Sequence, residues 1–264
     1  MEAVRLNKYL SETGYCSRRE ADRLIQEGRI LVNGAAPELG CKVTSSDQIM
    51  IDGKKLVPPT KAPVYLAFHK PVGIECTTNQ KVKNNVVDYI NYPERIFPIG
   101  RLDKASEGLL LLTNDGDIVN KILRARNQHE KEYLVTVDLP INPRFVQRMS
   151  AGIPILGTVT RPCEVQSIGN KAFRIILTQG MNRQIRRMCE HLGYQVQSLK
   201  RVRIMSITLD VAPGQYRLLT DAEINRLQDL LVDSDKVAPD AVEKVSNNQI
   251  IKYSPKNGYQ RRQR

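Results

Sequence analysis

An aspartate between two cations is the first candidate for chemistry in this 264-residue chain. Asp103 lies between Arg101 and Lys104, and neighbouring cations favour the ionised form of a carboxyl group. An ionised carboxylate can act as a nucleophile or as a base. The alternative is structural, because an aspartate that precedes a leucine-rich strand can simply cap a turn. For an isolated aspartate in this position, the structural role is the usual one.

A second candidate site is a group of cations near the start of the chain, Lys8, Arg18, Arg19 and Arg23. Arg19 and Arg23 are four residues apart and share one face of a helix. Arg18 and Arg19 stand at the expected start of that helix, where the helix dipole disfavours cations. A nearby phosphate would account for this placement, since backbone N–H groups at a helix start also bind anions. An ordinary solvated face, neutralised by nearby acidic residues, is an equally compatible interpretation.

The composition favours a polyanionic partner and indicates no metal or cofactor. Forty Lys and Arg against 28 Asp and Glu give a formal charge of +12, which suits binding to nucleic-acid phosphates. Five scattered cysteines and three scattered histidines predict neither a zinc site nor a disulfide framework. The chain has no glycine-rich nucleotide-binding motif. It has no apolar run near the ~20 residues of a membrane span and no secretory signal, so we expect a cytoplasmic protein without a membrane partner.

Two folded domains and a tail are expected. Residues 1–60 combine two short helices with short strands, and the proline-rich stretch 57–63 is typical of a linker. Residues 61–232 mix strands and helices with few long helical crossovers, which favours an α+β domain with a mixed, mainly antiparallel sheet. Residues 233–264 lose periodicity and hold seven Lys or Arg against four Asp or Glu, so we expect a disordered basic tail.

The candidate residues stand next to strongly patterned elements. Ser17 and Glu20 form a capping-box pattern that predicts the start of a helix. LLLLTNDGD predicts a buried strand that ends in a turn, and KEYLVTVDL predicts an alternating strand. NRQIRRMCEHLG predicts a helix with one apolar face. A second capping box, at Thr220 and Glu223, predicts the start of the last helix.

The N-terminal pattern RLNKYLSETGYCSRREADRLIQEGRILVNG resembles the S-four (alpha-L) RNA-binding domain. It has a short helix, a Ser-Arg start to the second helix and a Val-Asn-Gly turn. The resemblance covers residues 5–55. It implies a module in which the helix pair presents basic residues to structured RNA, recognised mainly by shape and backbone.

The stretch GRLDKASEGLLLLTNDGD, residues 100–117, resembles the catalytic motif of the pseudouridine synthases. Within them the chain is similar to the branch named after the ribosomal small-subunit synthase A, which has an N-terminal S-four domain and acts on ribosomal RNA. The resemblance implies that Asp103 is the catalytic aspartate. HKPVG at 69–73 matches the Lys-Pro-x-Gly segment that precedes the active site in this family.

Two further motifs extend the resemblance. KEY at 131–133 is similar to the family's Lys-x-Tyr, which implies that Tyr133 stacks on the target base; taken alone, such a tyrosine is more often a core aromatic. QGMNRQIRRMCEHLG resembles the last family motif, in which Arg186 corresponds to the basic residue that pairs with the catalytic aspartate. The candidate RNA-binding residues are then Lys8, Arg18, Arg19, Arg23, Arg101, Lys104, Arg183 and Arg187.

The resemblance implies an isomerase that detaches uracil from its sugar and rejoins it through carbon 5 without a cofactor. The expected substrate is a uridine of structured ribosomal RNA, 23S rRNA first and transfer RNA second, flipped out of its stem. The expected enzyme is a monomer. Attack of Asp103 at carbon 6, attack at the ribose and a glycal route are all compatible with the sequence. Alternative functions are a noncatalytic RNA- or ribosome-binding protein, and a synthase of this family acting on small-subunit or transfer RNA.

Overall fold

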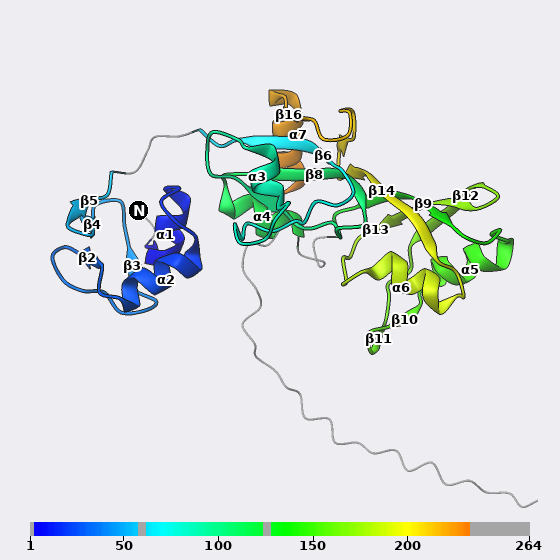
Figure 1. Ribbon diagram of the computed structural model, residues 1–264, viewed down its shortest axis with the longest axis horizontal. Coiled ribbons are helices and arrows are strands. Elements are labelled where there is room, and N and C mark those ends of the chain that lie inside the picture. The colour runs from blue at the N-terminus through cyan, green and yellow to red at the C-terminus, as the bar shows by residue number, and fades with distance from the viewer. Residues whose placement is uncertain (1–2, 58–61, 124–127, 233–264) are drawn as a thin grey trace, which may run out of the picture.

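The computed structural model describes residues 3–57, 62–123 and 128–232. Figure 1 shows an N-terminal unit beside a longer unit built on a sheet. The tail expected at 233–264 lies outside the described residues. The elements of the N-terminal unit are β1 (Val4–Arg5), α1 (Leu6–Glu12), α2 (Arg18–Gln26), β2 (Ile30–Val32), β3 (Lys42–Val43), β4 (Ile49–Ile51) and β5 (Lys54–Lys55).

The N-terminal unit has its own apolar core. Leu6 and Leu10 of α1 are buried, as are Ala21, Leu24 and Ile25 of α2, and they pack with apolar residues of the short strands. β2, β4 and β5 form an antiparallel sheet, while β1 pairs with β3. The helix pair is therefore held by burial of one face of each helix, and the opposite faces stay open to solvent.

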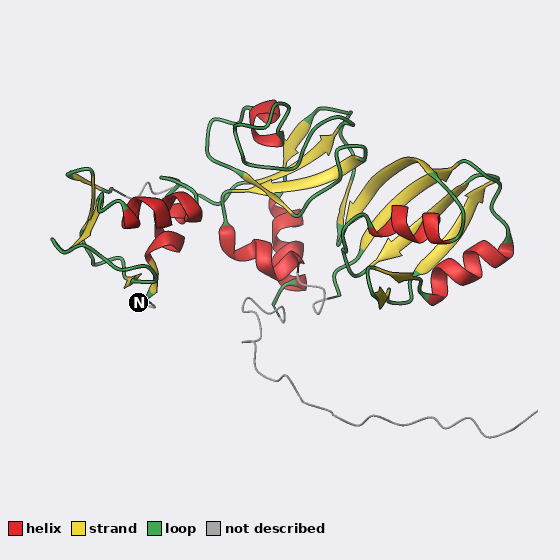
Figure 2. Ribbon diagram, turned by 60° about the horizontal axis from the view of Figure 1, so that its bottom comes forward, coloured by secondary structure: helices red, strands yellow, loops and turns green. Residues whose placement is uncertain are grey.

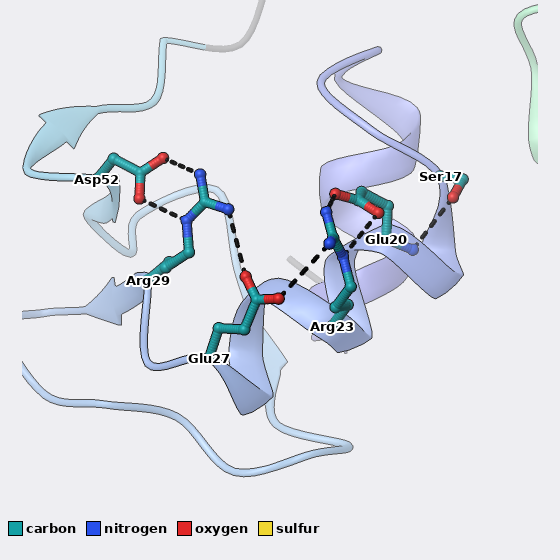
Figure 3. Close-up of polar contacts among 6 residues, drawn as sticks. All are labelled: Ser17, Glu20, Arg23, Glu27, Arg29 and Asp52. Carbon is teal, nitrogen blue, oxygen red and sulfur yellow. Dashed lines mark hydrogen bonds and ion pairs between the residues drawn. The ribbon is translucent and has the colours of Figure 1, made fainter.

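The first predicted capping box is half right. The Ser17 hydroxyl accepts a hydrogen bond from the backbone N–H of Glu20 at 3.1 Å, as expected. The Glu20 carboxylate instead binds the guanidinium of Arg23 (Figure 3), because a charge-assisted bond to guanidinium is stronger than one to a neutral N–H. The second box, at Thr220 and Glu223, is confirmed in both directions.

The second unit is built on a nine-stranded sheet in the order β12-β13-β9-β14-β8-β6-β16, with β7 on β8 and β15 on β14. All of its neighbouring strands are antiparallel except β14 and β8, which are parallel, so the predicted mixed, mainly antiparallel sheet is confirmed. A separate hairpin joins β10 to β11. The strands are β6 (Tyr65–Lys70), β7 (Phe97–Ile99), β8 (Glu107–Thr113), β9 (Lys131–Val137), β10 (Pro154–Ile155), β11 (Thr158–Val159), β12 (Glu164–Gly169), β13 (Ala172–Leu177), β14 (Val196–Ile204), β15 (Ile207–Thr208) and β16 (Tyr216–Leu218).

Helices cover this sheet in two groups. α5 (Pro143–Ala151) and α6 (Gln184–His191) pack on one face of β13, β9 and β14, as Figure 2 shows. α4 (Gly116–Leu123) and α7 (Asp221–Leu230) pack on one face of β6 and β8, and α3 (Val86–Ile90) packs on the other. The helices α6 and α7 were predicted from the sequence, whereas α3 and α5 were not.

The two halves of the sheet meet where β8 and β14 run parallel. The ladder there pairs Glu107 with Lys200 and Gly108 with Arg201. Gly108 has a φ of +111°, and a Cβ at this position would lie 2.2 Å from the carbonyl oxygen of Arg201. Only glycine permits this backbone approach. Because β8 directly follows the loop that contains Asp103, the junction brings that loop against the second half of the sheet.

Candidate active site

A cavity of about 600 Å³ lies at this junction, a size typical of small-ligand sites. Asp103, Tyr133 and Arg186 all line it. They come from three different places, the loop between β7 and β8, strand β9 and helix α6. The three residues predicted to be catalytic are therefore brought together by the fold, although 83 positions separate the first from the last (186 − 103).

The loop of Asp103 is held by the segment that follows β6. The carbonyl of Lys104 accepts a hydrogen bond from the backbone N–H of Gly73 at 2.8 Å. Lys70 is fully buried, and its ammonium donates to two backbone carbonyls of the turn 71–74 at 2.8 and 2.9 Å. The Lys-Pro-x-Gly segment thus has a physical role here, because the buried lysine fixes the turn and the turn fixes the position of Asp103.

Arg186 ties helix α6 to the same loop. Its side chain donates to the carbonyl of Ala105 at 2.9 Å and to the hydroxyl of Ser106 at 3.0 Å. Its Nε lies 3.9 Å from Oδ2 of Asp103, which is an ion-pair distance and not a hydrogen bond. Burial lowers the pKa of the Arg186 guanidinium, and the Asp103 carboxylate partly offsets this effect. The charge is retained, so Arg186 supplies a buried cation beside a carboxylate that is 34% exposed.

Tyr133 forms part of the cavity wall and part of the core at once. It is 8% exposed and packs with the apolar residues that β9, β13, α5 and α6 contribute. Its backbone pairs with Ile175 on one side and with Arg201 on the other. This position fits both expectations from the sequence, because Tyr133 is a core aromatic and also lines the cavity. Its stacking role stays a prediction.

The predicted RNA-binding cations near Asp103 divide between the rim of the cavity and its surroundings. Arg101, Lys104 and Arg183 are exposed and line the cavity. The Lys104 ammonium lies 3.1 Å from a carboxylate oxygen of Glu75. Arg187 is not among the lining residues, and it donates to the backbone and side chain of the loop before α6. Three of the four cations thus lie on the rim of the cavity, and their RNA-binding role stays a prediction.

The predicted cations of the N-terminal unit differ in their availability. Arg18 and Arg19 are exposed. The Lys8 ammonium lies 2.6 Å from a carboxylate oxygen of Asp117 in α4. Arg23 forms ion pairs with two glutamates of its own segment, as Figure 3 shows. Such solvent-exposed pairs contribute little stability, so they can be exchanged for phosphate contacts, and the RNA-binding role of all four residues stays a prediction.

Two buried cations that the sequence analysis did not select also line the cavity. Lys131 is 8% exposed and donates to the carbonyl of His129 at 3.2 Å. Burial, together with the charge of Arg201, lowers the pKa of Lys131 to about 8. Arg201 is 3% exposed, its Nε donates to the carbonyl of Leu109 at 2.7 Å, and its Nη2 is buried without a hydrogen-bond partner. The Lys-x-Tyr motif contains Lys131 and could have identified it, whereas the sequence around Arg201 predicted only a strand.

The cavity side chains supply a carboxylate for nucleophilic or base chemistry, an aromatic ring for stacking and cations for negative charge. Within the described ranges, no group of three or more His, Cys, Asp or Glu side chains could hold a metal ion. The helices in the same ranges include none that is long and apolar enough to cross a membrane. What remains to be decided is the substrate on which this set acts.

Comparison with known proteins decides the family. The model of the RNA pseudouridylate synthase family matches residues 64–191, and the model of the S4 domain matches residues 4–49. The chain is 54% identical over 243 residues to the dual-specificity RNA pseudouridine synthase RluF of Escherichia coli (strain K12), covering 90% of this chain and 83% of that protein. This chain belongs to the RNA pseudouridine synthases.

Other similarities agree with this assignment. The synthase is 37% identical over 236 residues to the ribosomal large subunit pseudouridine synthase B of Bacillus subtilis (strain 168), covering 86% of this chain and 96% of that one. A crystal structure of a pseudouridylate synthase superposes with a TM-score of 0.63 at 27% identity, covering 85% and 99% of the two chains. The predicted combination of an S-four domain with a pseudouridine synthase fold is therefore confirmed. The branch named after the small-subunit synthase A stays a prediction.

Proposed function

We propose that this synthase converts a specific uridine of structured ribosomal RNA, in the 23S molecule, to pseudouridine, with Asp103 as the catalytic carboxylate. The observation that carries the proposal is the meeting of Asp103, Tyr133 and Arg186 in one cavity. The name of the Bacillus subtilis relative supports a large-subunit substrate. The words dual-specificity in the name of the Escherichia coli relative support a second RNA substrate, for which we propose transfer RNA.

In the proposed reaction the target uridine leaves its stem and enters the cavity. Stacking on Tyr133 supplies ~1–3 kcal/mol towards this flipping step. Asp103 then acts on the nucleotide while Arg186 orients its carboxylate and places a positive charge beside it. The bond between N1 of uracil and the sugar breaks, the bond between C5 and the sugar forms, and the C5 proton is lost while N1 gains a proton. Substrate and product therefore contain the same atoms.

The proposal assigns phosphate binding to two groups of cations. Arg18 and Arg19 of the N-terminal unit contact the RNA backbone away from the reacting uridine, with Lys8 and Arg23 joining when RNA displaces their carboxylate partners. Arg101, Lys104, Arg183 and Arg187 contact phosphates near it. Affinity then comes from backbone charge and RNA shape. We further propose that the synthase acts as a monomer in the cytoplasm and belongs to the branch named after the small-subunit synthase A.

The test of the chemistry is Asp103→Asn, measured by tritium release from RNA whose uracil carries tritium at C5. The variant should lose activity while its melting temperature and RNA affinity stay near those of the wild type. Asp229→Asn, on the exposed last turn of α7, is the matched control and should remain active. Turnover by the Asp103→Asn enzyme above a few per cent of wild type would remove Asp103 from its assigned role.

The substrate is tested separately, by mapping pseudouridines in ribosomal and transfer RNA from a strain that lacks the gene. One 23S position should revert to uridine, and a transfer-RNA position should revert with it. Reintroducing the wild-type gene should restore both, and the Asp103→Asn gene should restore neither. If all 23S pseudouridines persisted, the large-subunit substrate would be wrong even if Asp103 were catalytic.

A further inference from the structure

The cavity holds more buried positive charge than its carboxylates can balance. Eight charged side chains line it, and two of these, Glu75 and Asp103, are carboxylates. Glu75 faces Lys104 on the rim, and Asp103 faces Arg186. The remaining buried cations, Lys131 and Arg201, have backbone carbonyls as their hydrogen-bond acceptors. Burying a charge without a partner of opposite sign is unfavourable. We therefore expect a bound substrate to supply the balancing negative charge during function.

The placement of these two cations indicates where the missing charge lies. Lys131 and Tyr133 are two residues apart on β9 and thus point to the same face of the sheet. Arg201 is the direct partner of Tyr133 on β14. The two cations therefore flank the ring on which the flipped base is proposed to stack. Nη2 of Arg201 is buried and lacks an acceptor, while the bond from its Nε to Leu109 fixes the guanidinium in place.

We propose that Lys131 and Arg201 form a subsite that donates hydrogen bonds to the carbonyl oxygens of the flipped uracil and stabilises the negative charge that develops there. This inference rests on the proposed function. When the N1–sugar bond breaks, its electron pair stays on the uracil and spreads onto O2 and O4. When a nucleophile adds to C6, the electrons move towards C5 and O4 instead. In each route this electron pair forms the new C5–sugar bond. Loss of the C5 proton then returns the C–H pair to the ring while N1 gains a proton, so the subsite acts on a charge that every route creates.

A base oxygen fits this subsite better than a phosphate does. Lys131 and Arg201 are 8% and 3% exposed, so a group that bonds them must lose its water, and this costs less for a neutral base carbonyl than for a charged phosphate. The cations suited to hydrated phosphates are exposed on the rim of the cavity, where Arg101 and Arg183 lie. Donors fixed in advance in a water-excluded site are also the arrangement that stabilises developing charge most effectively.

The protonation of Lys131 gives the subsite a pH dependence. Its pKa of about 8 means that the free enzyme carries the proton at neutral pH and loses it above pH 8. Negative charge on the base favours the protonated form, so the reaction should slow as Lys131 loses its proton in alkaline solution. Arg201 on β14 and His129 before β9 interact with it electrostatically. The other charged groups that line the same cavity are Glu75, Arg101, Asp103, Lys104, Arg183 and Arg186.

The experiment compares Lys131→Met, Lys131→Arg and the matched control Lys171→Met, which removes an exposed lysine of the turn between β12 and β13. Single-turnover tritium release is measured at saturating 23S RNA from pH 6 to 10, with RNA dissociation constants and melting temperatures alongside. Lys131→Met should lower the saturated rate ~10²-fold, the usual effect of removing one donor to a developing oxyanion. Its RNA affinity and its folding should be retained, because the Lys131 ammonium bonds a backbone carbonyl and its removal leaves no buried carboxylate without a counter-charge.

Lys131→Arg separates an electrostatic role from a packing role. It should keep part of the rate and lose the decrease above pH 8, because guanidinium stays charged there. The subsite is refuted if Lys131→Met keeps the wild-type rate, or if it loses RNA affinity and salt dependence while keeping the saturated rate, which would make Lys131 a phosphate contact. Wild-type enzyme that forms no pseudouridine in 23S RNA would overturn the proposed function instead, so the two failures are distinguishable.

Discussion

Replacement of Arg186 by methionine separates active-site electrostatics from RNA binding. The variant removes the guanidinium that faces Asp103 at 3.9 Å and donates to Ala105 and Ser106. Methionine retains much of the length and apolar contact of the arginine stem, so α6 should still pack through Ile185, which is buried in the core beside it. The expected result is a lower saturated rate with nearly unchanged RNA affinity and salt dependence.

The magnitude follows from the distance and the exposure of the pair. Two unit charges 3.9 Å apart attract by about 4 kcal/mol at an effective dielectric constant of ~20. Because 34% of the Asp103 side chain is exposed, solvent screening reduces this attraction to about 1 kcal/mol. If the reaction depends on a carboxylate held and oriented by this pair, the rate should therefore fall by roughly 5–10-fold.

Single-turnover kinetics at saturating RNA and salt-titrated binding measure the two quantities separately. Arg187→Met is the comparison on the same helix: Arg187 lies outside the cavity lining, so its loss should weaken binding and flatten the salt dependence with the saturated rate retained. If Arg186→Met lost affinity but kept its saturated rate, Arg186 would be a phosphate contact. Another cation would then have to stabilise Asp103.

Three further predictions concern the remaining parts of the molecule. Arg19→Ala should raise the RNA dissociation constant and reduce the slope of log K against log salt by ~0.7–0.9, and Arg23→Ala should change the slope less because its guanidinium is already ion-paired. Removal of residues 1–60 should weaken RNA binding far more than it lowers the saturated rate; binding as tight as that of the whole chain would refute an RNA-binding role for the N-terminal unit. Gly108→Ala should destabilise the fold by about 3 kcal/mol or more in urea unfolding, whereas Gly116→Ala, where the nearest atom to the added Cβ is 3.9 Å away, should not.

Elements with strong local patterns could be predicted from the sequence. The leucine run before Asn114 gave a buried strand, and the alternating residues after Lys131 gave another, because burial of one or both faces leaves a direct periodic signal. Helix α5 was not predicted, although Asn142 as its cap and a proline at its first position are a helix-start signal. The Ser17 cap was predicted correctly, but the expected bond from the Ser17 N–H to the Glu20 carboxylate was wrong, because that carboxylate accepts from the Arg23 side chain instead.

The candidate site was predictable only in part, for a physical reason. Asp103, Tyr133 and Arg186 were found through motifs, and the cavity contains all three. Arg201 could not be found in this way, because the stretch around it looks like any charged strand. Its burial follows from the pairing of β14 with both β9 and β8, and strand order is a long-range property that local periodicity does not encode.

The sheet junction explains why the site needs these particular cations. The loop of Asp103 belongs to the half of the sheet that contains β8, whereas Tyr133 and the buried cations belong to the half that contains β9, β14 and α6. Arg186 crosses the junction to the carbonyl of Ala105, and Arg201 crosses it to the carbonyl of Leu109. The same two side chains therefore connect the two halves of the sheet and supply positive charge to the cavity wall. A substitution that loosens either bond should disturb the carboxylate and its counter-charges together, so stability and catalysis are coupled at this junction.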